Sequence, residues 1–298
     1  MTRSVAVLLN PAAGRGRSAR AAALVVPRLE QSGLRVQQLQ GRTAAEAAEQ
    51  ADGVARAGVD ALVVIGGDGM VHLALQALGD ADIPVGVIPT GSGNDVARLL
   101  GVDRTDPVPA ADAIIGGATR RLDLADVAGT RVVTVVATGF DSRVNERANA
   151  MRWPAGQLRY TIATLAELRV FEPVHYSLEL DGSPYQMEAM LVAVGNGPSY
   201  GGGLRICEGA RPHDGLLDVV VIRPLSKVEL VRVYPRLFTG SHVRHRAYEH
   251  HRVRTATVAA PGLVAYGDGE RLGPLPITVR VVPGSVRFFV PSDRPGPA

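Results

Sequence analysis

Short apolar runs alternate with helix-like segments through the first 120 residues of the chain. These runs are too short for helices and too continuous for half-exposed strands, so they predict buried β-strands. Buried strands that alternate with helices are typical of a parallel sheet covered by helices on both faces, which is a three-layer α/β domain. The predicted strands are Val5–Leu9, Val36–Leu39, Ala61–Ile65 and Val85–Ile88, and the predicted helices are Ala19–Gln31, Thr43–Ala57, Val71–Leu78 and a segment that ends at Leu100.

Strand-like segments dominate after Leu122. The dipeptides Asp181-Gly182 and Asp268-Gly269 are typical of hairpin turns. Two helices are predicted among the strands, at Leu158–Val170 and from Ser226 onward. We expect a mainly antiparallel β-sandwich, with a barrel as the alternative. The predicted strands are Arg131–Thr138, Val174–Leu180, Glu188–Val194, Leu217–Ile222, Val253–Ala259, Ile277–Val282 and Val286–Val290.

The predicted domains are residues 1–122, which would bind nucleotide, and residues 123–285, with residues 286–298 free to return to the first domain. A chain of 298 residues is long enough for two domains. Its net charge of +3 is too small for a dedicated nucleic-acid binder. The single cysteine, Cys207, excludes an internal disulfide and a cysteine-built metal site.

The chain has no run of roughly 18 apolar residues, which is the length that spans a bilayer. Its first apolar run is too short for a signal-peptide core. We therefore expect a cytoplasmic protein. Its only lysine is Lys227, so the chain has no Walker A loop, and any phosphate chemistry must use other loops.

Three glycine-bearing loops follow three predicted strands of the first domain: NPAAGRG (Asn10–Gly16), GGDGM (Gly66–Met70) and PTGSGND (Pro89–Asp95). Loops at the carboxyl ends of parallel strands share one edge of the sheet, where ligands bind. Glycines let backbone N–H groups approach phosphate, and arginines such as Arg15 and Arg17 add charged contacts. The alternative is that the glycines only permit tight turns, with Asp68 and Asn94 as helix caps.

These loops resemble the motifs of the diacylglycerol kinase catalytic-domain family, which includes sphingosine kinases and bacterial lipid kinases. The likeness continues through GGGLRICEGARPHDGLLDV (Gly201–Val219) and GDGE (Gly267–Glu270). Met70 and Ser92 stand where the family has threonine, Arg15 stands where bacterial relatives often have lysine, and Arg159 lies near the place of a helix lysine. The resemblance implies that ATP is bound by Asn10, Gly14, Arg15, Gly66, Gly67, Asp68, Gly69, Thr90, Gly91, Ser92, Asn94 and Asp95.

The GDGE motif carries the chemistry that the resemblance implies. Transfer of phosphate to an alcohol benefits from a carboxylate that accepts the proton. The family assigns this role to the aspartate of the motif, so Asp268 becomes the expected base, and Glu270 would contact nucleotide or metal. From spacing alone, Asp268-Gly269 is also a plain hairpin turn.

A Mg²⁺ site is expected at Asp214, with Asp218 as second ligand and Asp123 in the same network. Oxygen ligands at close spacing suit this ion, and bacterial relatives hold Mg²⁺ in this region. The alternative is a turn at Asp214, with Asp218 opening a strand.

The expected activity is transfer of the γ-phosphate of ATP to diacylglycerol. The alternatives are another lipid alcohol such as a sphingoid base, a soluble substrate as in NAD kinases, and a silent nucleotide- or lipid-binding regulator. The expected partner is the anionic inner face of the membrane, where a lipid would enter a cleft between the domains, and a homodimer stays open. Residues 231–254 hold six arginines and four histidines against one glutamate, which predicts either a solvated surface or the contact with anionic lipid.

Overall fold

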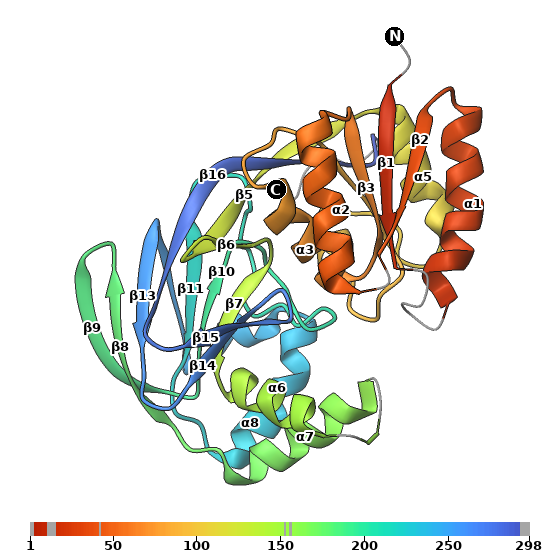
Figure 1. The fold of residues 1–298 in the computed structure, drawn as a ribbon. Helices are drawn as coiled ribbons and strands as arrows, with labels where there is room; N and C mark the ends of the chain where they lie inside the picture. Colours follow the sequence, from red (N-terminus) through yellow and green to blue (C-terminus); the bar gives the residue numbers. More distant parts are fainter. Residues whose placement is uncertain (1–2, 11–15, 42, 152, 155–156, 293–298) are drawn as a thin grey trace. The chain divides into compact units, whose positions relative to one another are not determined.

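The computed structural model of the chain describes residues 3–10, 16–41, 43–151, 153–154 and 157–292 (Figure 1). By its internal contacts the chain divides into two units, which are taken in turn below. Unit 1 consists of Met1–Leu124 and Pro283–Ala298, and unit 2 of Ala125–Val282.

Unit 1 contains a parallel sheet with strand order β2-β1-β3-β4. The central strands are almost wholly buried, whereas the polar edge strand β2 is largely exposed. This difference follows from their composition, because the central strands carry apolar residues toward both helix layers. The strands are β1 (Ser4–Leu9), β2 (Arg35–Gln40), β3 (Ala61–Gly66) and β4 (Val85–Pro89).

Helices cover both faces of this sheet, so the predicted three-layer arrangement is confirmed (Figure 1). Helices α1 (Arg17–Gln31) and α5 (Pro107–Gly116) contact each other on one face, and α2 (Ala44–Ala57) and α3 (Asp68–Leu78) do so on the other. The short α4 (Asp95–Leu100) follows β4. The sequence interpretation missed α5, although its start carries ordinary signals. Asp106 caps the helix by accepting from the Val108 N–H at 2.9 Å, and Pro107 occupies the first turn.

Unit 2 is built on two antiparallel layers, which confirms the predicted β-sandwich. One layer has strand order β12-β11-β10-β7-β14-β15, and the other contains β16, β13, β8 and β9, with β5 paired with β16 and β6 paired with β5. A core of apolar side chains such as Tyr176, Val219 and Val258 lies among these strands. The strands are β5 (Thr119–Val127), β6 (Thr130–Val132), β7 (Val135–Gly139), β8 (Val174–Leu180), β9 (Ser183–Ala189), β10 (Leu191–Gly195), β11 (Leu217–Ile222), β12 (Tyr248–Val253), β13 (Thr255–Ala259), β14 (Val264–Gly267), β15 (Glu270–Pro274) and β16 (Ile277–Phe289).

Two strand predictions were wrong in their boundaries. The strand expected at Arg131–Thr138 is interrupted at Val133 and Thr134, whose backbone N–H groups donate to Asp268 instead of to a neighbouring strand. The two strands expected after Ile277 form one strand, β16, which continues through Pro283 and Gly284. Its first half pairs with β13, and Phe288 near its end pairs with Val85 of β4. The final segment of the chain therefore completes the sheet of unit 1.

A second apolar core of unit 2 involves helices and the strands β7, β10 and β11. Helix α6 was not predicted, because its sequence is mostly polar and lacks a side-chain cap. The helical elements are α6 (Phe140–Ala150), α7 (Gln157–Val170), α8 (Lys227–Val233) and the short 3-10 segments η2 (Tyr234–Phe238) and η3 (Ser241–Arg244).

Candidate active site

The glycine loops of unit 1 lie at one edge of its sheet. Strand β1 pairs with β3 and β3 with β4, all in parallel, so the segments that follow them emerge on the same side. Of the first loop, the structure describes Asn10, whereas the expected ligands Gly14 and Arg15 lie outside the described residues. The other two loops, the Gly66 loop (Gly66–Met70) and the Gly91 loop (Pro89–Asp95), are described in full.

The Gly66 loop and the Gly91 loop pack backbone against backbone. A Cβ atom added to Gly91 would lie 2.6 Å from the Cα atom of Gly67, and one added to Gly67 would lie 3.0 Å from the Cα atom of Gly91. The amide of Thr90 also donates to the Gly66 carbonyl at 2.9 Å. These glycines are therefore required by contact between the loops, whatever ligand the loops bind.

Asn94 gives the Gly91 loop its shape. Its side-chain oxygen accepts from the Gly91 N–H at 2.9 Å, and its amide nitrogen donates to the Gly91 carbonyl at 3.0 Å. Asn94 itself adopts φ 53°, a left-handed conformation that asparagine tolerates better than most residues. At the start of the loop, the buried Thr90 hydroxyl bonds the Ser18 hydroxyl at 2.9 Å and so ties the loop to α1. Ser92, between them, is exposed.

Two aspartates fix the helices that follow the loops. Asp68 begins α3, and its carboxylate accepts from the Val96 N–H of α4 at 3.0 Å. The buried Asp95 begins α4 and pairs with Arg98 at 2.5 Å. Gly69 lies in the first turn of α3. The predicted cap role of Asp68 is thus replaced by a cross-link between two helices, which holds their N-termini together.

The arrangement suits an anionic ligand such as a phosphate group. The N-terminus of α3 carries partial positive charge, and flexible glycine backbone surrounds it. Arg17 approaches the same edge, because its guanidinium lies 3.5 Å from the Gly91 carbonyl oxygen. Met70, which departs from the family motif, packs against Gly66, where an added Cβ would lie 2.6 Å from the Met70 Cβ.

Asp268 occupies a hairpin turn of unit 2 and is nearly buried. Its carboxylate accepts from the backbone N–H groups of Val133 and Thr134, both at 2.9 Å, and from the Thr134 hydroxyl at 2.6 Å. With φ 51° it forms the turn between β14 and β15 together with Gly269. The structure thus shows both the turn and a clamp across the break between β6 and β7. Its role as base stays a prediction, as does the role of the exposed Glu270.

Asn196 is a residue that the sequence interpretation did not single out. It is fully buried after β10, and its amide nitrogen donates to the Val133 carbonyl at 2.7 Å. The backbone N–H groups of Asn196 and Gly197 both donate to the Thr134 carbonyl. Asn196 and Asp268 therefore hold the Val133–Thr134 break from two sides. The Gly-Asn-Gly sequence around Asn196 is the signal that could have identified it.

Asp214 and Asp218 lie close to Arg252. The Arg252 guanidinium pairs with the Asp214 carboxylate and lies 3.8 Å from that of Asp218. Asp218 is buried in β11, and His250 bonds one of its oxygens at 2.7 Å. Asp214 also caps its own turn by accepting from the Leu216 N–H at 3.1 Å.

The hydrogen-bond and ion-pair partners of Asp214 and Asp218 do not fit a preformed Mg²⁺ site. A cation already lies beside both carboxylates, and the described part of the chain contains no group of three or more histidine, cysteine, aspartate or glutamate side chains that could hold a metal. Asp123, the third expected ligand, is buried in unit 1, where it accepts from the Gly284 N–H at 2.8 Å and secures the bend of β16. The metal therefore stays a prediction of the family resemblance.

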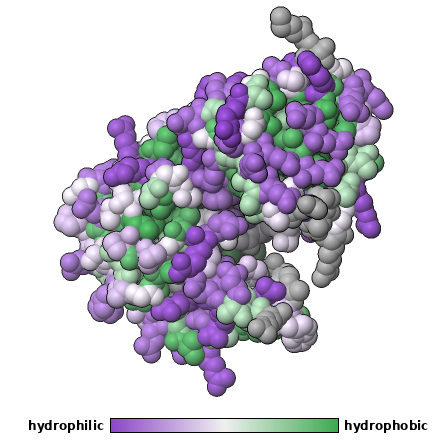
Figure 2. Space-filling view, viewed as in Figure 1, coloured by the Kyte–Doolittle hydropathy of each residue, from purple (hydrophilic) through white to green (hydrophobic). Residues whose placement is uncertain are grey.

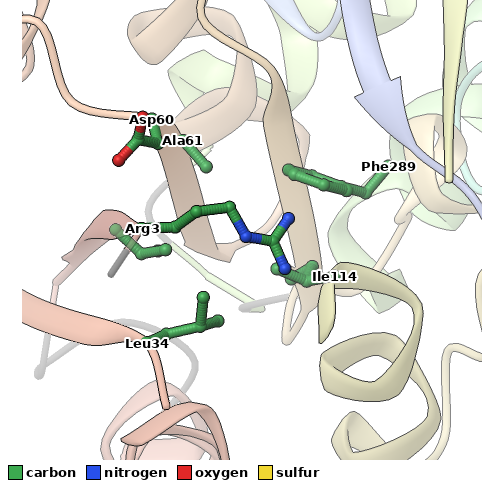
Figure 3. A pocket seen from close by; sticks show the side chains of 7 residues that line it. Arg3, Leu34, Asp60, Ala61, Ile114 and Phe289 are labelled. Atoms are coloured by element: carbon green, nitrogen blue, oxygen red, sulfur yellow. The ribbon is translucent and has the colours of Figure 1, made fainter. Parts of the chain in front are cut away.

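A small pocket of unit 1 lies at the other edge of the sheet, near the amino ends of β1 and β3 (Figure 3). The Arg3 side chain extends there toward Phe289 and Ile114. Asp60 beside it accepts from the Ser4 N–H at 2.6 Å, and this hydrogen bond lowers the pKa of the carboxyl. Ligands of open α/β sheets bind at the carboxyl ends of the strands, so this pocket is separate from the glycine loops.

Comparison with solved structures supports the fold. The structure is similar over 97% of its length to a putative diacylglycerol kinase from Bacillus anthracis, with a TM-score of 0.82, 22% sequence identity and 95% of that chain covered. At this identity the likeness concerns the fold. No helix in the described residues combines the length and hydropathy needed to cross a bilayer.

Comparison with known sequences identifies the family. The diacylglycerol kinase catalytic domain matches residues 4–127, and the YegS C-terminal NAD kinase beta sandwich-like domain matches residues 134–290. The chain is 41% identical to the diacylglycerol kinase of Mycobacterium tuberculosis, over 96% of this chain and 95% of the relative. It is 30% identical to a probable YegS-like lipid kinase of Pseudomonas fluorescens, over 80% of each. With both domains matched in order around the loops and the GDGE turn described above, the chain belongs to the family of bacterial lipid kinases that carry the diacylglycerol kinase catalytic domain.

Proposed function

We propose that this lipid kinase transfers the γ-phosphate of ATP to the hydroxyl of diacylglycerol, giving phosphatidic acid. The observation that carries the nucleotide half of the proposal is the position of the Gly66 loop and the Gly91 loop at the carboxyl ends of β3 and β4, beside the N-terminus of α3. Kinases of this family use ATP, and a phosphate chain needs backbone N–H groups and a helix N-terminus of this kind.

The choice of acceptor rests on the relatives. The relatives from Mycobacterium tuberculosis and Bacillus subtilis are named diacylglycerol kinases, at 41% and 27% identity. The Pseudomonas relatives are named only as YegS-like lipid kinases, which favours another lipid alcohol as the second candidate. The 41% identity to the Mycobacterium tuberculosis relative supports diacylglycerol as the first candidate.

In the proposed reaction, Asp268 accepts the proton of the lipid hydroxyl as that oxygen attacks the γ-phosphorus, and ADP leaves. Three donors orient its carboxylate, which preorganises the group at the cost of part of its accepting capacity.

The test is a radiolabelled-ATP assay over a panel of lipid alcohols in mixed micelles: diacylglycerol, monoacylglycerol, a sphingoid base and ceramide. We expect labelled phosphatidic acid as the main product. NAD and glycerol serve as soluble acceptors. Preferred labelling of a different lipid would replace the acceptor, and labelling of none would leave a nucleotide-binding regulator as the better description.

A further inference from the structure

Helices α7 and α8 of unit 2 carry an unusual number of exposed apolar side chains. Among the residues that the structure describes, twelve large hydrophobic side chains are exposed, and ten of them lie between residues 153 and 238. Figure 2 shows hydrophobic surface among hydrophilic surface over this part of unit 2. We call six of these residues the α7–α8 surface: Leu158, Ile162, Leu165, Val228, Val231 and Phe238.

The stripe on α7 is regular. Leu158, Ile162 and Leu165 follow the spacing i, i+4, i+7, so they lie on one face of the helix, and they are 56%, 38% and 62% exposed. The opposite side of the helix contains Ala163, which is fully buried, and Glu167, which pairs with Arg147 of α6 at 2.5 Å. A helix normally turns such a stripe toward a core. Here the stripe is exposed, and no element in the described part of the chain covers it.

Helix α8 extends the same surface. Val228 and Val231 are 60% and 56% exposed, whereas Val233 is buried in the apolar core beside them. The two helices are in contact, and the ammonium group of Lys227 donates to the Arg169 carbonyl near the end of α7. The exposed apolar residues of α7 and α8 therefore lie on two helices that contact each other.

The charges around this surface are mainly positive. Segments α7, α8 and η2 contain five basic residues against two acidic ones, and both acids already have basic partners on other elements. Glu167 pairs with Arg147, and Glu229 pairs with Arg246 at 2.8 Å. The five basic residues are Arg159, Arg169, Lys227, Arg232 and Arg236.

We propose that the α7–α8 surface docks the protein on an anionic lipid bilayer, with its apolar side chains inserted at the level of the headgroups. Exposed apolar side chains flanked by basic residues bind such interfaces. A second copy of the chain is a poorer occupant, because it would bring two positive rims together. Trp153, 80% exposed just before α7, suits the same interface. The inference deepens the proposed function, on which it rests, by giving the enzyme access to an insoluble substrate.

This proposal moves the membrane contact from the segment that the sequence favoured. Within residues 231–254, Arg246 and Arg252 are engaged in ion pairs with Glu229 and Asp214. Tyr248 packs against the apolar core. Val231 and Phe238 of that segment stay in the docking surface, together with the basic residues Arg232 and Arg236.

The test compares a triple variant, Ile162→Ser/Leu165→Ser/Val231→Ser, with the parent chain in sedimentation with vesicles of phosphatidylglycerol and phosphatidylcholine. We expect at least a tenfold loss of binding at an unchanged melting temperature, because the three side chains are exposed. Leu24→Ser is the matched control, since Leu24 is 55% exposed on α1 of unit 1 and should bind vesicles like the parent. Parental binding by the triple variant would overturn the proposal. The proposal would also be overturned if the parent chain forms a dimer and the triple variant loses this dimer but still binds vesicles.

Activity assays separate this proposal from the proposed function. Phosphorylation of a short-chain, water-soluble diacylglycerol should be equal in the triple variant and the parent, while phosphorylation of diacylglycerol in vesicles should fall with binding. If vesicle phosphorylation is equal in both, docking at α7–α8 is wrong and the kinase assignment stands. If vesicle binding falls as expected but neither protein phosphorylates diacylglycerol, the substrate assignment is wrong and the docking surface stands.

Discussion

Gly91 lies where the packed Gly66 and Gly91 loops of unit 1 leave no room for a side chain. Its missing side chain lets the Cα atom of Gly67 approach, and a Cβ atom there would also lie 2.8 Å from the side-chain oxygen of Asn94. The contact is made with backbone, which cannot swing aside. A single methyl group at this point should therefore distort both loops at once.

We expect Gly91→Ala to cost about 1–3 kcal/mol of stability and to abolish the rise in melting temperature that ATP produces. Gly67→Val should behave alike, because it disturbs the same contact in addition to any phosphate. Gly53→Ala is the control, since an added Cβ there meets nothing within 4 Å and α2 gains a better helix former. Differential scanning fluorimetry with and without ATP measures both effects. Normal ATP stabilisation of Gly91→Ala would mean that nucleotide binds elsewhere.

A comparison of Asp268 with Asp181 can distinguish a catalytic role of Asp268 from a purely structural one. Both occupy an Asp-Gly hairpin turn with positive φ, and both accept from two successive backbone N–H groups of another segment. At Asp268 each N–H uses a different oxygen, whereas at Asp181 one oxygen, Oδ1, accepts from both N–H groups. Asparagine therefore places an amide donor beside a backbone N–H in both variants, at a larger cost in stability for Asp268→Asn.

We expect Asp268→Asn to lower kcat by about 100-fold or more, and Asp181→Asn to leave kcat within about twofold of the parent. Melting temperatures of both variants should fall, which controls for the shared structural cost. Steady-state kinetics with a short-chain diacylglycerol makes the comparison. Equal kcat values in the two variants would leave Asp268 as a clamp for Val133 and Thr134 only.

At the scale of elements, helix α6 begins with a half-buried acid, Asp141. Asp141 lies in its first turn, and one of its carboxyl oxygens is buried without a hydrogen-bond partner in the described part of the chain. Burial raises the pKa of Asp141 from 3.8 to about 7. A carboxyl group with this surrounding is neutral in the folded protein at mildly acidic pH, whereas the unfolded chain ionises it.

The raised pKa of Asp141 makes the stability of the folded protein depend on pH. Between about pH 4 and pH 7 the unfolded state binds fewer protons at this position, so the contribution of Asp141 to stability falls as pH rises and is fully lost above pH 7. We expect Asp141→Asn to be more stable than the parent at pH 8, by up to about 4 kcal/mol, and to differ much less at pH 4.5. Urea unfolding at the two pH values measures this. An equal difference at both would show that Asp141 does not titrate in this way.

At the scale of the whole molecule, the two units contain different parts of the site proposed for a lipid kinase. Unit 1 contains the glycine loops, and unit 2 contains the GDGE turn and the α7–α8 surface. Ligands of the two units should therefore slow hydrogen exchange in different segments of the chain. Each unit has its own buried residues, so a ligand of one unit need not stiffen all of the other.

We expect ATP to slow hydrogen exchange most in residues 66–72 and 90–98, because these segments contain the two packed loops and the starts of α3 and α4. The hairpin of β8 and β9 should exchange at the same rate with and without ATP and serves as the internal control. Anionic vesicles should instead protect residues 157–170 and 227–238. ATP protection confined to the helices of unit 2 would contradict the assignment of nucleotide binding to unit 1.

The amino-acid sequence by itself determined the order of the elements and the class of chemistry. Apolar runs such as Ala61–Ile65 predict buried strands because their side chains must leave water wherever the chain folds. The three glycine loops and the GDGE turn gave the family, since they are local motifs whose residues are adjacent in the chain. The sequence interpretation missed two helices. Helix α5 carries ordinary start signals, a capping aspartate and a first-turn proline, whereas the sequence of α6 is mostly polar.

Only the tertiary structure decided which distant residues meet. Gly67 and Gly91 contact each other across 24 positions of sequence, and Asp268 reaches Thr134 across 134, so local patterns could not reveal either contact. The tertiary structure also decided whether the apolar face of a helix points into the protein or outward. The spacing of Leu158, Ile162 and Leu165 predicts a helix with one apolar face, but whether that face meets a core or an outside partner depends on what else packs there. The hydrophobic effect fixes which side chains seek an apolar environment, and long-range packing decides which of them find it inside the protein.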